Sequence, residues 1–343
     1  MKVFMIPKNH EYIKKLRSHL EKTGVSVRIL KPFHYSSLSN VAKMALLRLS
    51  GYRLIHVHWL YIFPFGPVMK LFYYMCRFLK IKIVWEMHNI VPHGSSEAGR
   101  KNSAWFYERA DAIIFHSKSD VDRAQELLGT CRDKTHIIIP HGNFNESYEN
   151  RTSKDEARRT LNIPPEGKVI LCFGFIRSNR GYKYLIEATK DMKDVTVLVA
   201  GKVTEKTLYE KLIGLNMELP NLKVYGGWIP DDEIQVFFNA CDAVVLPYTD
   251  ITTSGVIPLA YAFSRPVITT DIGGIKDVVN DRTGILVHPG DSAALRGAIE
   301  EMFTKDLDAM GRYCREYAKN TFDWEKNAGK IRGLYELVLG NDH

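Results

Sequence analysis

A short polar segment, Thr252-Thr253-Ser254-Gly255-Val256, directly precedes a small-residue segment that predicts a helix. Hydroxyl groups and free backbone N–H groups at the start of a helix bind anionic oxygens, because the positive end of the helix dipole points the same way. The segment lies between AVVLPY and PVITT, two apolar runs typical of buried parallel strands. The sequence therefore predicts a phosphate site at Thr253, Ser254, Gly255 and Val256, although the hydroxyl residues would also serve as an ordinary helix cap.

Two arginines supply a second set of candidate phosphate ligands. Arg177 and Arg180 follow the apolar run VILCFGF, which predicts a buried strand. A guanidinium matches phosphate geometry, and fixed cations stabilise a departing diphosphate without a divalent metal. We assign both arginines to a diphosphate, with solvated loop arginines as the alternative. The chain contains neither GxxxxGK[ST] nor GxGxxG, which argues against a P-loop kinase or NTPase and against a dinucleotide dehydrogenase.

Histidines and one carboxylate gather in the first half of the chain. His56 and His58 alternate on a predicted strand, so both face the same side. A zinc site would need a third ligand, and none has suitable spacing, so we predict no metal and assign the pair to packing or to the wall of a cleft. His88 and Asn89 end the run IVWEMHN, where a histidine can bind a sugar hydroxyl or transfer protons near neutral pH.

Three further side chains are candidates for the acceptor side. Glu86 and His93 flank the previous pair and could act as a base or position the acceptor, and His58 is placed with them. For Glu86 a paired structural carboxylate is an equal alternative. For each histidine the alternative is a hydrogen-bonded structural side chain.

Strand-like and helix-like runs alternate along the whole chain, which favours an α/β fold with two doubly wound parallel sheets. The polar segment 143–153 is the expected linker, so we place one domain at 1–150 and a second at 151–322. A last helix, within 323–343, is expected to pack back on the first domain. Ligands in such folds bind beyond the carboxyl ends of the strands, so a cleft between the sheets is the expected site.

Positive charge is concentrated at the start of the chain. Residues 1–82 contain 15 lysines and arginines but only two acidic residues, Glu11 and Glu21, so this segment has a net charge of +13. The whole chain has a net charge of +8, so the remainder carries −5. The segment Lys70–Lys80 is basic and aromatic, which suits a helix lying on anionic lipid, and an ordinary helix packed on its sheet is an equal alternative. Five scattered cysteines without a CxxC pair, and no N-terminal signal peptide, predict a cytoplasmic protein.

Several segments resemble a known family. GGWIPDDEI, NACDAVVLPY, SRPVITTDIGGIKDVV and DRTGILVHPGD are similar to successive motifs of glycosyltransferase family 4, and FGFIRSNRGY resembles the F-G-x-I-R-x-x-K-G loop of its polysaccharide-type members, with Arg180 at the lysine position. HVHWL, EMHNIVPHG and IIIPHGNF resemble segments of that same subgroup. The resemblance implies a GT-B fold, with Trp228 and Ile229 at the nucleotide base and His88 at the donor sugar.

The chain departs from the family at two glutamates. Their positions are occupied by Ile251 and Leu259, so the contact with the ribose must come from elsewhere. Asp250 is adjacent to the first position and could replace the carboxylate that reaches the donor sugar. Pro7-Lys8-Asn9-His10 replaces the usual glycine pair of the first loop, so that donor contact is not carried over.

The resemblance implies transfer of a sugar, from a UDP or GDP sugar and without cofactor or metal, to a glycan or to a polyprenyl or other lipid-linked acceptor. We expect a peripheral protein on the inner face of the membrane, held through the basic N-terminal domain. The family retains configuration, which we expect here, and the missing glutamates leave inversion open. Alternatives are an epimerase or hydrolase acting on sugar nucleotides, an inactive transferase, and a basic module that binds nucleic acid. The last lacks a nucleic-acid motif, so no nucleic acid is expected as a partner.

Overall fold

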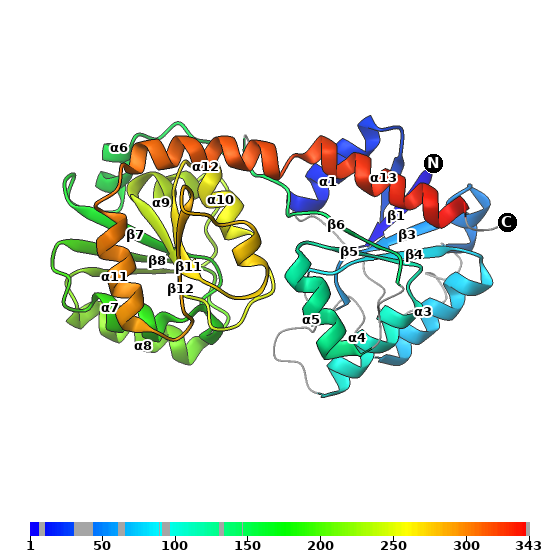
Figure 1. Ribbon diagram of the computed structural model, residues 1–343, viewed down its shortest axis with the longest axis horizontal. Helices are drawn as coiled ribbons and strands as arrows, with labels where there is room; N and C mark the ends of the chain where they lie inside the picture. Colours follow the sequence, from blue (N-terminus) through cyan, green and yellow to red (C-terminus); the bar gives the residue numbers. More distant parts are fainter. Residues whose placement is uncertain are drawn as a thin grey trace. The chain divides into compact units, whose positions relative to one another are not determined.

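The computed structural model describes residues 1–6, 11–30, 44–60, 66–88, 90, 97–129, 134–145 and 147–340. The chain divides into two compact units (Figure 1). The first comprises Met1–Gly142 and Asp323–His343, and the second comprises Asn143–Phe322. The division falls at the start of the polar segment 143–153, eight residues before the boundary placed from the sequence at 150.

The first unit contains a six-stranded parallel sheet in the order β2-β1-β3-β4-β5-β6. Its strands are β1 (Lys2–Ile6), β2 (Ser26–Ile29), β3 (Leu54–Val57), β4 (Lys82–Glu86), β5 (Ala112–Phe115) and β6 (His136–Ile138). Its labelled helices are α1 (Glu11–Lys22), α3 (Gly66–Phe78), α4 (Glu97–Arg109), α5 (Lys118–Leu128) and α13 (Trp324–Gly340). The alternating strands and helices predicted from the sequence are confirmed.

The two faces of this sheet are covered by different helices, as the two-residue period of a strand requires. On β1, Phe4 belongs to the core formed with α3, α4 and α5, whereas Val3 and Met5 belong to the core formed with α1 and α13. Figure 1 shows these two groups of helices on opposite faces of the sheet. Helix α13 contributes Ile331 and Leu334 to that second core. The last helix is therefore part of the first unit, although 180 residues of the other unit separate it from the first sheet along the chain.

The second unit contains another six-stranded parallel sheet, in the order β12-β11-β10-β7-β8-β9. Its strands are β7 (Lys168–Phe173), β8 (Val195–Gly201), β9 (Leu222–Gly226), β10 (Ala243–Leu246), β11 (Val267–Thr270) and β12 (Gly284–Val287). Its helices are α6 (Lys154–Thr160), the 3₁₀ turn η2 (Ser178–Arg180), α7 (Tyr182–Thr189), α8 (Lys206–Glu218), α9 (Ile234–Ala240), α10 (Val256–Ala262), η3 (Gly273–Asp277), α11 (Ser292–Met302) and α12 (Leu307–Thr321).

A buried ion pair fixes the start of this second sheet. Asp242, at the start of β10, accepts hydrogen bonds from the Arg158 guanidinium of α6 at 3.0 Å and from the Val169 backbone N–H of β7 at 2.7 Å. Lys154 also pairs with this carboxylate. Asp242 is thus a structural residue of this unit.

In both sheets the strand order reverses next to the first strand. The reversal lies between β1 and β3 in the first unit and between β7 and β10 in the second. Loops that leave the carboxyl ends of two strands at such a point diverge to opposite faces, which opens a crevice where ligands bind in α/β proteins. We therefore expect ligand-binding residues in the loops after β7 and β10 and in the loops after β1 and β3.

Candidate functional site

The loops after β7 and β10 hold the predicted phosphate ligands. Arg177 and Arg180 lie in and beside η2, after β7, and the segment 252–256 leads from β10 into α10, which begins at Val256 as predicted. Asn179 joins the two loops, because its side chain donates to the Asp250 carbonyl at 2.8 Å and its carbonyl accepts from the Thr249 N–H at 3.0 Å. The structure thus brings both arginines and the hydroxyl segment to one edge of the sheet.

Gly181 allows these loops to approach. Its φ is +72°, in the left-handed region, and a Cβ there would overlap the carbonyl oxygen of Pro247. Glycine alone meets both conditions without strain. On the far side, Gly274 N–H donates to the Thr252 carbonyl at 2.9 Å, so the hydroxyl segment is held from two directions.

Arg180 is a buried cation without a carboxylate partner among the described residues. Arg180 is only 7 % exposed, and its guanidinium lies 4.7 Å from the centre of the Tyr248 ring. Neither Nε nor Nη1 has a hydrogen bond from the described part of the chain. A buried guanidinium with unused donors is costly, which indicates that a ligand supplies the missing acceptors.

Arg177 lies close enough to Arg180 for the two positive charges to interact. Burial lowers the pKa of its guanidinium, and the charge of Arg180 lowers it further. Two cations that repel one another are held together by the fold, so an anion is the ligand that would relieve the repulsion. Tyr248, which the sequence did not single out, supports the pair: its ring lies under Arg180 and its hydroxyl is 2.8 Å from Ser254 Oγ.

The other residues predicted for the second unit occupy different places. Trp228 is 70 % exposed, and Ile229 packs partly against the core. Both residues follow β9, which lies two strands away from β7 in the sheet. Asp250 is exposed and acts electrostatically on Arg177. Ile251 and Leu259, at the positions of the family glutamates, are both buried in the hydrophobic core. Those positions therefore contribute packing and offer no ligand atoms.

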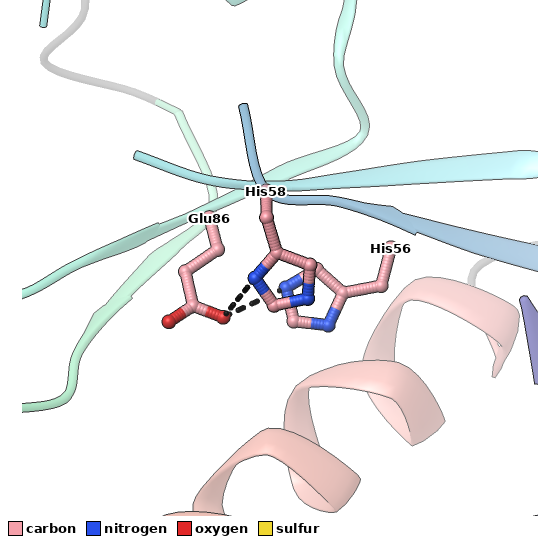
Figure 2. Close-up of side chains that lie close together, drawn as sticks. All are labelled: His56, His58 and Glu86. Atoms are coloured by element: carbon pink, nitrogen blue, oxygen red, sulfur yellow. Dashed lines mark ion pairs between the residues drawn. The ribbon is translucent and has the colours of Figure 1, made fainter. Parts of the chain in front are cut away.

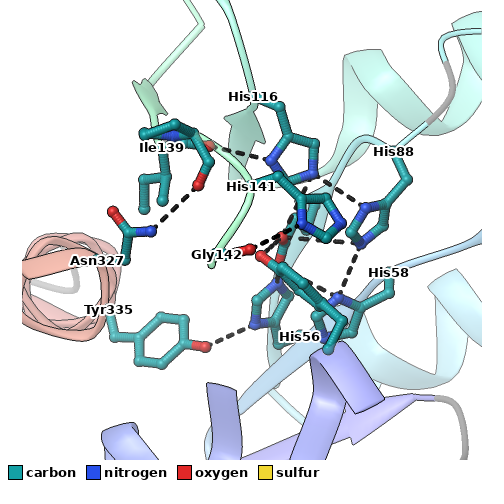
Figure 3. A network of polar contacts seen from close by, with 12 residues as sticks. His56, His58, His88, His116, Ile139, His141, Gly142, Asn327 and Tyr335 are labelled. Carbon is teal, nitrogen blue, oxygen red and sulfur yellow. Dashed lines mark hydrogen bonds and ion pairs between the residues drawn. The ribbon is translucent and has the colours of Figure 1, made fainter. Parts of the chain in front are cut away.

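A cluster of four histidines surrounds Glu86 in the first unit (Figure 3). The carboxylate, fully buried at the end of β4, lies 3.0 Å from His56 Nε2 and 3.2 Å from His58 Nδ1 through Oε2. Its other oxygen, Oε1, lies 3.5 Å from His116 Nε2 and 3.7 Å from His88 Nε2. Histidines in or directly after three neighbouring strands, β3, β4 and β5, therefore meet at one edge of the sheet.

Two tyrosines complete the cluster from the helices on one face. The Tyr12 hydroxyl of α1 donates a hydrogen bond to Glu86 Oε1. The Tyr335 hydroxyl of α13 is 2.7 Å from His56 Nδ1 (Figure 3). Burial and the charge of Glu86 raise the pKa of Tyr12, so this phenol stays protonated and remains a donor. Both aromatic partners hold the cluster in a fixed orientation.

Hydrogen bonds fix the tautomers in the series of neighbouring histidines His116, His88 and His58. His116 Nδ1 is 3.0 Å from the Ile139 carbonyl, which can only accept, so Nδ1 carries the proton. In the neutral ring His116 Nε2 then accepts from His88 Nδ1 at 3.0 Å. His88 Nε2 is left as the acceptor for His58 Nδ1 at 3.3 Å. Both ring nitrogens of His88 are thus engaged inside the unit, which argues against a direct side-chain contact with a sugar hydroxyl in this arrangement.

The environment fixes the charges as well. Burial lowers the pKa of His58 to about 4, and it also lowers the pKa of His88. Burial alone would raise the pKa of Glu86, but the neighbouring His58 and the contacts with His56 hold it well below its usual range. Near neutral pH, Glu86 is therefore ionised while His58 and His88 are neutral.

Two predicted residues, Asn89 and His93, lie outside the described residues. His116, Tyr12 and Tyr335 were not predicted. His116 follows β5 next to β4, so the position of its strand could have indicated it, whereas the two tyrosines come from helices whose packing no local pattern discloses. Glu86 is the third neighbour of His56 and His58 that their spacing along the chain did not indicate (Figure 2).

Comparison with known proteins identifies the family. A family model described as "Glycosyltransferase Family 4" matches residues 10–142, and one described as "Glycosyl transferases group 1" matches residues 167–305. The chain belongs to glycosyltransferase family 4. Among curated relatives, the D-inositol 3-phosphate glycosyltransferase of Corynebacterium urealyticum is 25 % identical over 72 % of this chain and 61 % of its own length. The putative teichuronic acid biosynthesis glycosyltransferase TuaC of Bacillus subtilis is 25 % identical over 83 % of this chain and 70 % of its own. The chain thus spans about three fifths of the length of the first of these relatives.

Solved structures establish the GT-B fold. Sucrose-phosphate synthase from Thermosynechococcus elongatus superimposes with a TM-score of 0.78 at 18 % identity, covering 100 % of both chains. HepE of Anabaena, solved in complex with UDP-glucose, superimposes with a TM-score of 0.76 at 18 % identity over 98 % of this chain and 99 % of its own. The prediction of two doubly wound domains of the GT-B type is confirmed.

Proposed function

We propose that this protein transfers a sugar from a nucleoside diphosphate sugar to a glycan or lipid-linked acceptor. The observation that carries the proposal is the pair Arg177 and Arg180, which repel one another at the strand reversal of the second unit. Arg180 is buried with unused donors, and the hydroxyl segment 252–256 is tied to the same edge. A diphosphate is the anion whose size and charge would use all three.

This arrangement supports transfer without a metal at the diphosphate. Negative charge accumulates on the leaving diphosphate as the glycosidic bond breaks, and two fixed guanidiniums can neutralise it directly. Thr253, Ser254, Gly255 and Val256 would add hydroxyl and backbone donors at the start of α10. We assign the base to the loop of Trp228 and Ile229, and propose UDP or GDP as the nucleotide. No other cofactor is needed.

Retention of configuration is our expectation for the transfer. It follows the family, and Asp250 is the carboxylate nearest the lost glutamate position that could reach the donor sugar. His88 would act through its backbone or its fixed neighbours, because both of its ring nitrogens are engaged. Asn89 remains assigned to the donor sugar and His93 to the acceptor side, together with His58 and Glu86. Proton NMR of the anomeric signal of the first product formed distinguishes retention from inversion.

Product analysis tests the reaction class. The protein is incubated with UDP-glucose or GDP-mannose, with and without membranes that contain lipid-linked glycans. Transfer predicts a labelled lipid or glycan and free nucleoside diphosphate only when acceptor is present. An epimerase would convert the donor without acceptor, and a hydrolase would release free sugar at the same rate with or without membranes. Either of these results contradicts the transfer proposal.

The surface of α3 supports an acceptor at a membrane. Leu71, Tyr74 and Phe78 are 48 %, 61 % and 87 % exposed on one face of this helix, next to the basic Lys70 and Arg77. An exposed stripe of apolar and basic side chains suits the interface of an anionic bilayer. No helix of the described residues is both long and apolar enough to span a membrane.

A second exposed apolar pair lies beside that helix. Leu46 and Leu49, on a helical segment at 44–49, are 63 % and 85 % exposed. Arg48 of this segment donates to the Leu79 carbonyl at 2.8 Å, which holds it at the end of α3. We propose that this surface lies on the cytoplasmic face of an anionic membrane and brings the acceptor to the first unit.

Vesicle binding tests the membrane proposal. Wild type is expected to cosediment with vesicles that contain phosphatidylglycerol and to dissociate as salt rises. Serine at both 71 and 78 should weaken binding by about tenfold or more, because each apolar side chain contributes upward of 1 kcal/mol when buried. Met217→Ser, a change of an 84 % exposed residue on α8 of the other unit, is the matched control. Equal loss in the control, or no binding by wild type, contradicts the proposal.

A further inference from the structure

His56, His58 and Glu86 share a feature that hydrogen bonding does not explain. Their side chains are fully buried and lie side by side at the ends of β3 and β4 (Figure 2). His56 Nε2 and Glu86 Oε2 are 3.0 Å apart, yet neither atom makes a properly aligned hydrogen bond with the described residues. The ring N–H direction therefore does not run along the line that joins the two atoms.

The distances from Glu86 Oε2 to the two imidazole nitrogens are compatible with a metal coordination sphere. One ligand atom from each of the three residues lies within 4.8 Å of the others, and the contacts with Glu86 Oε2 are 3.0 Å and 3.2 Å. A tetrahedral zinc ion with bonds of about 2.0 Å separates its ligand atoms by about 3.3 Å. In a metal site the ligand lone pairs point toward the ion and not along the lines that join the ligand atoms, which would account for the poor hydrogen-bond alignment.

We propose that His56 Nε2, His58 Nδ1 and Glu86 Oε2 form a binding site for a divalent transition-metal ion of the zinc class. The site is distinct from the diphosphate site of the second unit, and its ion would be structural. Two imidazoles and one carboxylate are a donor set that zinc uses in proteins.

Neighbouring side chains orient two of the three ligands. Tyr335 holds His56 Nδ1 at 2.7 Å, which directs Nε2 toward Glu86. Tyr12 donates to Glu86 Oε1, which leaves Oε2 facing the two imidazoles (Figure 2). Partners of this kind on the far side of a histidine and a carboxylate are typical of metal sites, where they fix the tautomer and the orientation.

A second group, Glu86 with His88 and His116, is less suitable. His116 Nδ1 is committed to the Ile139 carbonyl and His88 Nδ1 to His116 Nε2, both at 3.0 Å. Its contacts with Glu86 are longer, at 3.5 Å and 3.7 Å. These residues form a hydrogen-bonded chain, so we assign the ion to the first group.

A bound ion and the hydrogen bond to His88 would compete for the same atom, His58 Nδ1. Without an ion, His58 Nδ1 carries a proton and donates to His88 Nε2 at 3.3 Å. Coordination through Nδ1 requires the proton to move to Nε2, the opposite tautomer. Metal binding would therefore change the tautomer of His58, and imidazole ¹⁵N NMR can detect that change without any assay of activity.

Metal analysis of the full chain, produced without a polyhistidine tag, tests the proposal. The protein is incubated with Zn²⁺ near neutral pH, passed through a desalting column and analysed by mass spectrometry for metal. Wild type is expected to retain one zinc ion per chain, and Glu86→Gln and His58→Gln are expected to bind at least about tenfold more weakly. Co²⁺ in place of Zn²⁺ should give the intense visible bands of a tetrahedral site.

Two control variants and one stability measurement complete the test. His288→Gln removes an exposed histidine of the second unit and should retain zinc as wild type does. His116→Gln should also retain it, and equal loss there would overturn the assignment to His56 and His58. Zinc at about 100 times its dissociation constant should stabilise wild type by about 2.7 kcal/mol, a readout that does not depend on whether a variant folds. Absence of saturable zinc binding by wild type overturns the proposal. Nucleotide binding by the second unit is measured separately and is not affected by either outcome.

Discussion

Replacing Arg180 with methionine should weaken nucleotide binding without destabilising the protein. The guanidinium is buried, close to the like charge of Arg177, and its Nε and Nη1 donors are unused by the described residues. A hydrogen bond to a charged group contributes about 1.5–3 kcal/mol. Loss of two such donors to a diphosphate should therefore raise Kd by about a hundredfold or more, since each 1.4 kcal/mol is a factor of ten.

The same change should leave the stability of the free protein nearly unchanged, because two effects offset one another. Removing an unpaired buried charge relieves a desolvation cost, while the contact with the Tyr248 ring, worth about 0.5–2 kcal/mol, is lost. The free energy of unfolding should therefore stay within about 1 kcal/mol of wild type. Methionine is chosen because it keeps most of the volume of the arginine stem.

Arg158→Met provides the matched control. Arg158 is also buried, but it is fully paired with Asp242 and with two backbone carbonyls. Its loss should lower the free energy of unfolding by about 3 kcal/mol or more, because the Asp242 carboxylate would lose its buried partner and keep only the half-exposed Lys154 as a cation. Calorimetry with the nucleotide and urea unfolding without it are the two assays. If Arg180→Met destabilises as much as Arg158→Met and leaves affinity unchanged, Arg180 is a structural residue and the argument fails.

Other substitutions test the loops and the core. Gly181→Ala should destabilise the second unit by more than about 2 kcal/mol in urea and abolish nucleotide binding, because the residue has a φ of +72° and no room for a Cβ. Gly214→Ala, inside α8 with open space around it, should instead stabilise by about 0.5–1 kcal/mol, and equal effects of the two would refute the steric argument. Tyr12→Phe should cost about 1.5–3 kcal/mol through its bond to Glu86, whereas the exposed Tyr74→Phe should cost almost nothing. The four described cysteines are buried and burial raises the pKa of each thiol, so a thiol reagent at mildly alkaline pH should label them only after denaturation, and rapid labelling of the native protein would contradict their burial.

The sequence was sufficient to predict the sheets because parallel strands are buried on both faces and appear as short apolar runs. VILCFGF and VTVLVAG became β7 and β8, and the segment 252–256 precedes α10 as predicted. The arginines after β7 could also be placed at the edge of the sheet, because a loop that follows a strand begins where the strand ends. A family resemblance added the pairing of that loop with the segment 252–256.

Other features depended on tertiary contacts that no local pattern contains. His56 and His58 were correctly placed on one side of β3, and their rings stack 4.2 Å apart, but the approach of Glu86 arises from strand pairing. Tyr335 reaches His56 across 279 positions of the chain. Asp231 and Asp232 stand just before α9, where aspartates typically cap a helix, but α9 begins at Ile234 and no side chain caps it.

The central claim is that the second unit binds a nucleoside diphosphate through cationic side chains. Calorimetry of wild type with UDP, GDP, ADP and dTDP, in the presence of EDTA, tests it most directly. The account predicts that one of these nucleotides, with UDP or GDP expected, binds in a metal-free solution and that its affinity falls as salt screens the two arginines. Failure of all four to bind, or binding only after a divalent metal is added, would contradict it.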